Sequence, residues 1–202
     1  YSQKTPNFRC ADYEDFRVML EMEKAIDAIL CATPDHLHAY VTLYAMRAGK
    51  HVYCEKPLTH NIREARLVAK VAKETKVATQ MGNQGQAGEE VRLLCETIWD
   101  GAIGQVQEVC AWGNRQIPKP GYLPAAGDPP SHLHYDLWIG PVPFRPYTPL
   151  WVHWNWRGWL AYGGGTIGDW ICHVVDPSFW ALDLGGHGPP VDARGLEAVA
   201  AG

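Results

Sequence analysis

The sequence predicts an α/β protein whose first half forms a doubly wound parallel sheet. Apolar runs of strand length recur at residues 25–32, 51–55 and 77–82. Segments with helical periodicity separate these runs, and the links between them are short. This alternation is typical of parallel sheets in which a helix connects each strand to the next.

The first run, 25–32, is nearly continuous in apolar residues, as expected of a strand buried on both faces of a parallel sheet. A helix is predicted over 35–50, because its apolar positions follow the helical period and Gly49 supplies a C-terminal stop. The next strand, 51–55, ends before Pro57, since proline lacks the N–H that a strand ladder needs. These stops delimit one strand–helix–strand unit.

The following helix is predicted from its start signal. Asn61 and Glu64 have the spacing of a capping box, in which each side chain accepts a hydrogen bond from a free N–H at the helix start. This helix should extend to about residue 75. A third strand over 77–82 and a third helix over 87–99 complete the alternation.

The second half of the chain is less regular. A strand is predicted over 106–113, where apolar and polar residues partly alternate. A long stretch rich in proline and glycine follows over 117–149, and its aromatic and histidine content indicates a loop or cleft wall. A weak apolar segment at 191–200 is interpreted as the start of another strand. We therefore predict two domains, 1–103 and 104–202.

The composition excludes several classes of protein. The chain has 202 residues, of which 47% are hydrophobic and 20% charged, as in an ordinary globular protein. Its net charge of -4 gives no electrostatic reason to expect nucleic acid or an anionic membrane as a partner. No apolar run approaches the roughly 20 residues of a membrane helix, and the first residues show no signal-peptide pattern.

The six cysteines are scattered and form no C-x-x-C pair. This pattern predicts buried, reduced thiols rather than disulfides or a metal site. Most of the nine tryptophans lie between residues 138 and 180. They indicate either simple packing or the lining of a ligand cleft.

Four segments, in order along the chain, carry a family resemblance. They are TPDHLH at 33–38, GKHVYCEKP at 49–57, WR at 156–157, and GGG at 163–165 followed by Asp169, His173 and Asp176. Together they resemble the glucose–fructose oxidoreductase/inositol dehydrogenase (Gfo/Idh/MocA) family. The resemblance implies a Rossmann domain that binds NAD or NADP, followed by an α/β substrate domain with an open sheet. Relative to that pattern the chain lacks the first βαβ unit and the later strands, so we expect it to be a fragment.

The resemblance also implies roles for individual residues. Lys56 matches the catalytic lysine, which holds the reacting oxygen, and Glu55 matches a residue that hydrogen-bonds the ribose on the nicotinamide side. His173 matches the general acid/base, with Asp169 one helical turn earlier to orient the substrate or tune the imidazole. Without the resemblance, Lys56 and Glu55 fit a surface pair and His173 a core histidine. Asp176 fits a structural role better than a catalytic one.

The predicted cofactor-binding residues lie at strand ends or in the family motifs. They are Thr33, Pro34, His38, Glu55, Lys56, Asn83, Gln84, Trp156 and Arg157. Asn83 and Gln84 are included because they follow the carboxyl end of the third strand, where ligands of open α/β sheets bind. Asp35 and His36 are expected to cap the helix or face solvent. No metal ligands are predicted.

The glycine run at 163–168 matches the dinucleotide-binding pattern G-x-G-x-x-G, and Asp183 follows about 20 residues later, as that pattern requires. Its context does not match, because no buried strand precedes it and no βαβ unit surrounds it. We interpret it as a tight turn that lets a helix carrying Asp169 and His173 begin, since glycine tolerates such turns. The phosphate-binding loop is expected to lie before residue 1.

The predicted function is that of an NAD(P)-dependent oxidoreductase that transfers a hydride between nicotinamide and a hydroxyl or carbonyl of a sugar, polyol or related compound. Two alternatives are open: an NAD-dependent glycoside hydrolase of the same family, and a catalytically silent protein that senses a sugar or nucleotide. The expected partners are a small-molecule substrate and other copies of the chain, joined through the substrate-domain sheet. The expected compartment is the cytoplasm, with export as the alternative.

Overall fold

The computed structural model describes residues 9–113, 117, 121 and 125–185. The chain divides into two compact units. The first combines residues 1–82 with 115–169, and the second combines 83–114 with 170–202. The domain boundary between residues 103 and 104 stays a prediction.

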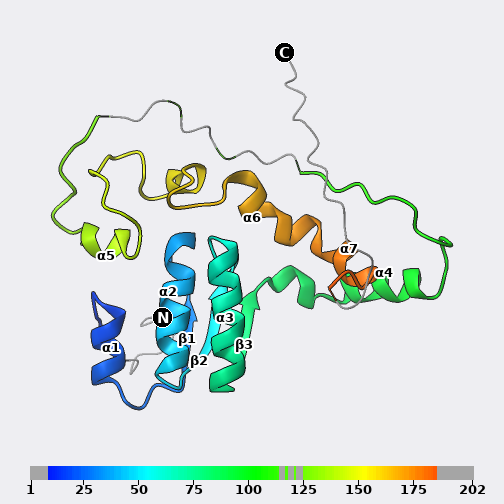
Figure 1. Ribbon diagram of the computed structural model, residues 1–202, viewed down its shortest axis with the longest axis horizontal. Helices are drawn as coiled ribbons and strands as arrows, with labels where there is room; N and C mark the ends of the chain where they lie inside the picture. The colour runs from blue at the N-terminus through cyan, green and yellow to red at the C-terminus, as the bar shows by residue number, and fades with distance from the viewer. Residues whose placement is uncertain (1–8, 114–116, 118–120, 122–124, 186–202) are drawn as a thin grey trace. The chain divides into compact units, whose positions relative to one another are not determined.

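The first unit contains a parallel sheet of three strands in sequential order (Figure 1). The strands are β1 (Ala28–Cys31), β2 (His51–Glu55) and β3 (Thr79–Gly82). The predicted α/β class with a parallel sheet is confirmed. The first and third strands are shorter than their apolar runs, because only the paired residues form ladder hydrogen bonds.

Helices α2 (Asp35–Arg47) and α3 (Ile62–Thr75) connect the strands. The start of α3 confirms the predicted capping box. The side-chain oxygen of Asn61 accepts the N–H of Glu64 at 2.9 Å, and the Glu64 carboxylate accepts the N–H of His60 at 2.8 Å. Both contacts satisfy N–H groups that the helix itself leaves free.

The sheet buries one face, not two. Ile29, Cys31, Val52 and Cys54 belong to the core cluster that also holds residues of α2 and α3. On the opposite face Leu30 is 69% exposed. The prediction of a strand buried on both faces is therefore wrong for β1. Strands joined in sequential order by right-handed crossovers place their helices on the same side, and no described element covers the other side.

A short helix before the sheet, α1 (Phe16–Met22), was not predicted from the sequence. Asp15 caps it by accepting the N–H of Arg17 at 2.8 Å. Phe16 packs edge to face against Tyr40 of α2, with ring centroids 5.6 Å apart. A helix of seven residues has too few turns to show a clear apolar period.

The rest of the first unit is built around an aromatic cluster. It includes the short helices α5 (Tyr135–Ile139) and η2 (Asn155–Gly158). The buried members are Tyr135, Ile139, Tyr147, Trp151, Trp156 and Tyr162. Trp151 and Trp156 are therefore packed in this cluster.

His36 connects α2 to this cluster, contrary to the expectation that it would cap the helix or face solvent. Its side chain is 1% exposed. Its Nε2 lies 2.7 Å from the carbonyl oxygen of Trp138, and its ring packs edge-on against Trp138 and Tyr162. Sequence patterns do not reveal this burial, because the cluster lies about 100 residues further along the chain.

Protonation of His36 should destabilise the fold. Burial lowers the pKa of His36 below its ordinary value of about 6.5, so the folded state favours the neutral ring. This stabilisation is present above about pH 6.5 and is lost as the pH falls through the lower pKa of the folded state. Urea unfolding from about pH 7.5 to about pH 5 should show the loss. It should be smaller in His36→Gln and unchanged in His132→Gln, an exposed control. Equal pH slopes in all three proteins would contradict this expectation.

The second unit is helical in its described part. Its elements are η1 (Gln84–Ala87), α4 (Glu89–Trp99), α7 (Asp176–Ala181) and the end of α6 (Gly165–Val174). Within this unit Trp99 Nε1 donates to the carbonyl of Ala181 at 2.8 Å, which fixes α4 to α7. The predicted third helix is thus an α-helix preceded by a 3-10 turn.

The strand predicted over 106–113 is not observed. The described residues after β3 form no strand, and Cys110 within this segment is exposed. A strand needs a neighbour to complete its hydrogen bonds, and these residues have none in the described part of the chain. The segment 191–200 lies outside the described residues. Association through a substrate-domain sheet stays a prediction.

No helix within the described ranges has the combined length and apolar character needed to cross a membrane.

Candidate functional site

An ion pair between Lys56 and Asp169 forms the centre of the candidate site. Lys56 follows β2 directly, and its Nζ donates to Asp169 Oδ1 at 2.7 Å and to the backbone oxygen of Asp169 at 2.8 Å. The side chains are 20% and 9% exposed. Such a charge-assisted pair, largely withdrawn from solvent, holds its geometry better than a surface pair does.

The position of Lys56 suits it to act on a ligand. It stands at the carboxyl end of a parallel strand, where open α/β sheets bind their ligands. A lysine ammonium has three N–H donors. Among the described residues Nζ has acceptors only in Asp169, so one donor is left for a ligand oxygen. An oriented cation of this kind stabilises negative charge that develops on that oxygen.

Arg157 is a second cation beside Asp169. Its Nε lies 3.7 Å from Asp169 Oδ1, and its guanidinium carbon lies 3.9 Å from the ring centre of Trp154 and 4.2 Å from that of Trp156. Trp156 is in turn fixed by donating Nε1–H to the carbonyl of His153 at 3.0 Å. Asp169 therefore lies between a lysine and an arginine held by aromatic rings.

The glycine run supports this arrangement by allowing close backbone approach. A Cβ on Gly163 would lie 2.7 Å from the Cα of Arg157, and one on Gly164 would lie 2.9 Å from the Cα of Gly168. Gly165 has φ +64° and opens α6, the helix that carries Asp169. The interpretation of this run as a tight turn at the start of a helix agrees with the structure.

Asp35, the first residue of α2, is a buried carboxylate near the glycine turn. It is 4% exposed, which corrects the expectation that it would cap a helix or face solvent. The backbone N–H of Gly164 lies near the Asp35 carboxylate and favours the charged form. Burial raises the pKa of Asp35, while the nearby His38 and Arg157 act in the opposite direction.

These contacts also test whether the glycine turn fits a cofactor pyrophosphate. The carboxylate of Asp35 lies near Gly164 and would repel a phosphate there. A 3-10 helix and a turn precede the run, not a strand. The turn does not fit a pyrophosphate. The assignment of the strand-end residues around Lys56 to the nicotinamide side of a cofactor stays a prediction.

Thr33, Pro34 and His38 follow β1. Pro34 is the N-cap of α2, and His38 is 1% exposed inside that helix. The two ring nitrogens of His38 lie 2.7 Å from the carbonyl oxygens of Thr33 and Pro57. His38 thus joins the loops that follow β1 and β2, and the position of Lys56 depends on the second of these loops.

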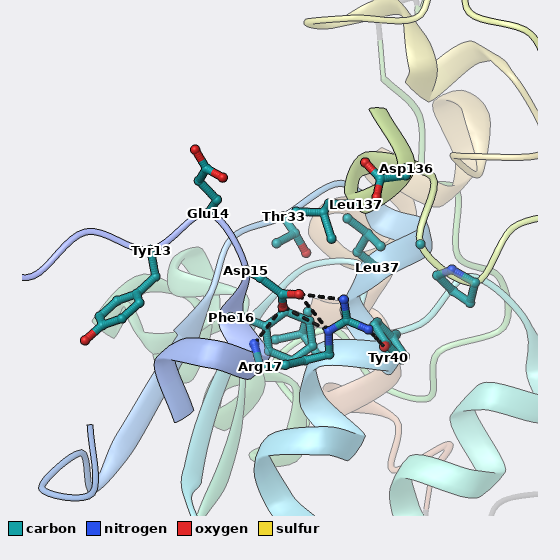
Figure 2. Close-up of a pocket in the computed structure, with 13 residues that line it drawn as sticks. Tyr13, Glu14, Asp15, Phe16, Arg17, Thr33, Leu37, Tyr40, Asp136 and Leu137 are labelled. Carbon is teal, nitrogen blue, oxygen red and sulfur yellow. Dashed lines mark hydrogen bonds and ion pairs between the residues drawn. The ribbon is translucent and has the colours of Figure 1, made fainter. Parts of the chain in front are cut away.

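A cavity of about 520 Å³ lies beside Thr33 (Figure 2). Figure 2 shows the paired side chains of Asp15 and Arg17 close to Tyr40 within it. Lys56 and Asp169 are not among its lining residues. The cavity is therefore separate from the ion pair. Of the residues predicted to bind the cofactor, Thr33 lines this cavity.

Glu55, Asn83 and Gln84 occupy the predicted strand ends. Glu55 is the last residue of β2 and pairs in register with Gly82, where a Cβ would lie 2.8 Å from the Glu55 carboxyl group. In the second unit, Asn83 Nδ2 donates to the carbonyl of Cys172 at 2.6 Å. Gln84 opens η1.

His173 belongs to the second unit, because the division between the units falls inside α6 after Asp169. Its ring packs edge-on against Trp170, with centroids 5.7 Å apart. Asp176 is the first residue of α7. The structure thus brings Lys56, Arg157 and Asp169 together, while the catalytic role of His173 stays a prediction.

Two protein-family models match the sequence. Residues 2–83 match an oxidoreductase family with an NAD-binding Rossmann fold (GFO_IDH_MocA), and residues 122–194 match the C-terminal alpha/beta domain of that family. The matches occur in the order of the two predicted domains.

Individual relatives extend over most of this chain. Levoglucosan dehydrogenase of Pseudarthrobacter phenanthrenivorans is 27% identical over 80% of this chain and 34% of its own length. The rhizopine catabolism protein MocA of Rhizobium meliloti is 27% identical over 90% of this chain and 58% of its own. The crystal structure of an NAD-binding protein from Listeria innocua aligns with TM-score 0.55 and 26% identity, over 85% of this chain and 39% of that one. The chain therefore spans about one third to three fifths of these relatives.

Proposed function

Because the chain belongs to the Gfo/Idh/MocA family of oxidoreductases, we propose that it transfers a hydride between a nicotinamide cofactor and a carbon that bears a hydroxyl or carbonyl group. The substrate is a sugar, a polyol or a related compound, and the cofactor is NAD or NADP. The observation that carries the proposal is the ion pair of Lys56 with Asp169 at the carboxyl end of β2.

Lys56 is the proposed oxygen-binding residue. Its remaining N–H donates to the substrate oxygen and stabilises the charge that develops there as the hydride leaves the neighbouring carbon. Asp169 contributes by fixing the ammonium through two acceptors, so that the remaining donor is oriented before substrate binds. Arg157 offsets the carboxylate charge from the other side.

His173 is the proposed general acid/base. An imidazole titrates near neutral pH, so it accepts a hydroxyl proton in one direction of the reaction and returns it in the other. It lies on α6, four residues after Asp169. That spacing of about one turn is the feature that supports its assignment.

The cofactor, when bound, supplies the hydride acceptor. Glu55 and Lys56 are the proposed contacts on its nicotinamide side, with Thr33 and Pro34 after β1 as further contacts. Trp156 and Arg157 are proposed to line the same region. The names of relatives such as levoglucosan dehydrogenase support a carbohydrate-like substrate.

The proposal is tested by incubating the full-length protein with NAD+ or NADP+ and a panel of sugars, polyols and glycosides. Formation of reduced nicotinamide that depends on one of these compounds would support the proposal. Release of sugar from a glycoside without net reduction would show the hydrolase instead. Binding of a sugar without turnover of any compound would show a sensor.

A further inference from the structure

The guanidinium of Arg157 has hydrogen-bond donors that the protein does not use. A guanidinium carries five N–H donors in one plane. Its Nε is buried and lies 3.7 Å from Asp169 Oδ1 without a hydrogen bond, so the contact with Asp169 is an ion pair only. In the part of the chain that the structure describes, the two terminal nitrogens have no acceptor, and the side chain is 22% exposed. These terminal N–H groups are therefore open to a ligand.

Two tryptophan rings hold this guanidinium in place. Its central carbon lies 3.9 Å from the ring centre of Trp154 and 4.2 Å from that of Trp156. Rings that stack on a guanidinium stabilise the cation and leave uncovered its edge, where the N–H groups lie. Because the donors are oriented before a ligand binds, binding costs less conformational entropy.

The arrangement of the donors indicates the chemistry of the ligand. Neighbouring N–H groups of an arginine match the two oxygens of a carboxylate or phosphate, which they bind as a pair. Asp169 does not fill this role, because its Oδ1 and its backbone oxygen both accept from Lys56. Asp35, the other carboxylate near Arg157, is 4% exposed and lies behind the surface that a ligand meets. The open donors therefore fit an anionic group of a ligand.

One small ligand can contact both Arg157 and Lys56. The same oxygen, Asp169 Oδ1, lies 2.7 Å from Lys56 Nζ and 3.7 Å from Arg157 Nε. If Lys56 holds the reacting oxygen, the group that Arg157 binds is only a few bonds from the reacting carbon. The pyrophosphate of a dinucleotide is separated from the nicotinamide by a ribose. An anionic group of the substrate itself fits this short separation better.

We propose that Arg157 binds a carboxylate of the substrate, and that the substrate is an acidic sugar derivative such as an aldonic or uronic acid. This inference rests on the proposed hydride transfer and narrows its substrate to compounds that carry a carboxylate. Arg157 then determines specificity, because a neutral sugar leaves the oriented donors without a charged acceptor.

The first test compares kcat/KM of the full-length protein for aldonates with that for the corresponding alditols, and for uronates with that for the corresponding sugars. We expect the acids to be preferred by about tenfold or more, mainly through a lower KM, as for hydrogen bonds to a charged group. Arg157→Met should remove most of this preference. Arg157→Lys should restore only part of it, because lysine keeps the charge but lacks the paired donors.

The ratio of acid to neutral substrate cancels any general loss of turnover in these variants. Arg66→Met, at an exposed arginine of α3, is the matched control and should retain the preference. A preference for neutral sugars or for sugar phosphates in the unchanged protein would overturn the proposal. So would an acid preference that persists in Arg157→Met.

A second measurement needs no turnover. Calorimetric titration of the protein with reduced cofactor bound should show that the acids bind at least about tenfold more tightly than the neutral compounds, and that Arg157→Met loses this difference. Weaker cofactor binding by Arg157→Met with an unchanged preference for acids would assign Arg157 to the cofactor phosphates and overturn the proposal. Selective binding of acids without turnover of any compound would instead reject the hydride transfer and uphold the carboxylate site.

Discussion

Replacing Lys56 with methionine should lower kcat by about 10²- to 10³-fold, the loss typical of removing one donor to a developing oxyanion. Methionine has a similar length but no N–H, so it removes the proposed contact with the substrate oxygen. Binding of reduced cofactor should change little, because Lys56 is proposed to act mainly on the reacting oxygen. Turnover and cofactor fluorescence titrations on the full-length protein measure the two effects separately.

This substitution also removes the ammonium that pairs with the largely buried carboxylate of Asp169. A buried charge that loses its partner destabilises a fold, so urea unfolding must accompany the kinetics. The double variant Lys56→Met/Asp169→Leu should recover stability without recovering turnover. Lys70→Met, on the exposed surface of α3, is the matched control and should retain turnover. Normal turnover in the Lys56→Met variant would disprove the catalytic assignment.

Replacing Gly163 with alanine should destabilise the first unit by about 1–3 kcal/mol. The added Cβ would lie 2.7 Å from the Cα of Arg157 and 2.8 Å from its carbonyl oxygen. Because these are backbone atoms, no rotation of a side chain relieves the contact. The turn must therefore shift, which also moves Arg157 and the start of α6. Urea unfolding measures the loss, and turnover should fall with it.

Gly168 provides the matched comparison within the same glycine run. A Cβ there would meet nothing within 4 Å, and the residue lies inside α6. Alanine is a better helix former than glycine, so Gly168→Ala should be neutral or stabilising by up to about 1 kcal/mol. Equal effects of the two substitutions would show that the close approach at Gly163 does not matter.

Local patterns in the sequence predicted much of the sheet and its helices. The apolar run at 25–32, the capping box at Asn61 and the stop at Pro57 each reflect interactions within a few residues. The prediction of a strand over 106–113 was wrong because a strand depends on a non-local interaction. It exists only when a partner strand completes its hydrogen bonds. The prediction that β1 is buried on both faces was wrong at Leu30, which is exposed. Burial of a strand depends on which elements cover the sheet.

The candidate site was predictable only in part. The family resemblance led to Lys56 and Asp169, and the structure brings them into contact. Asp35 was missed, because a carboxylate at the start of a helix is usually a capping residue, and its proximity to Gly164 depends on the approach of distant parts of the chain.

The separation between Lys56 and Asp169 has a consequence for how the protein folds. The two residues are 113 positions apart in sequence. Closing so long a loop costs conformational entropy before the contact can form. In contrast, β1, α2 and β2 associate across short separations in sequence. The ion pair should therefore form late in folding, after the sheet. Interactions that form late mainly affect the rate of unfolding, so loss of the contact proposed for catalysis should speed unfolding more than it slows folding.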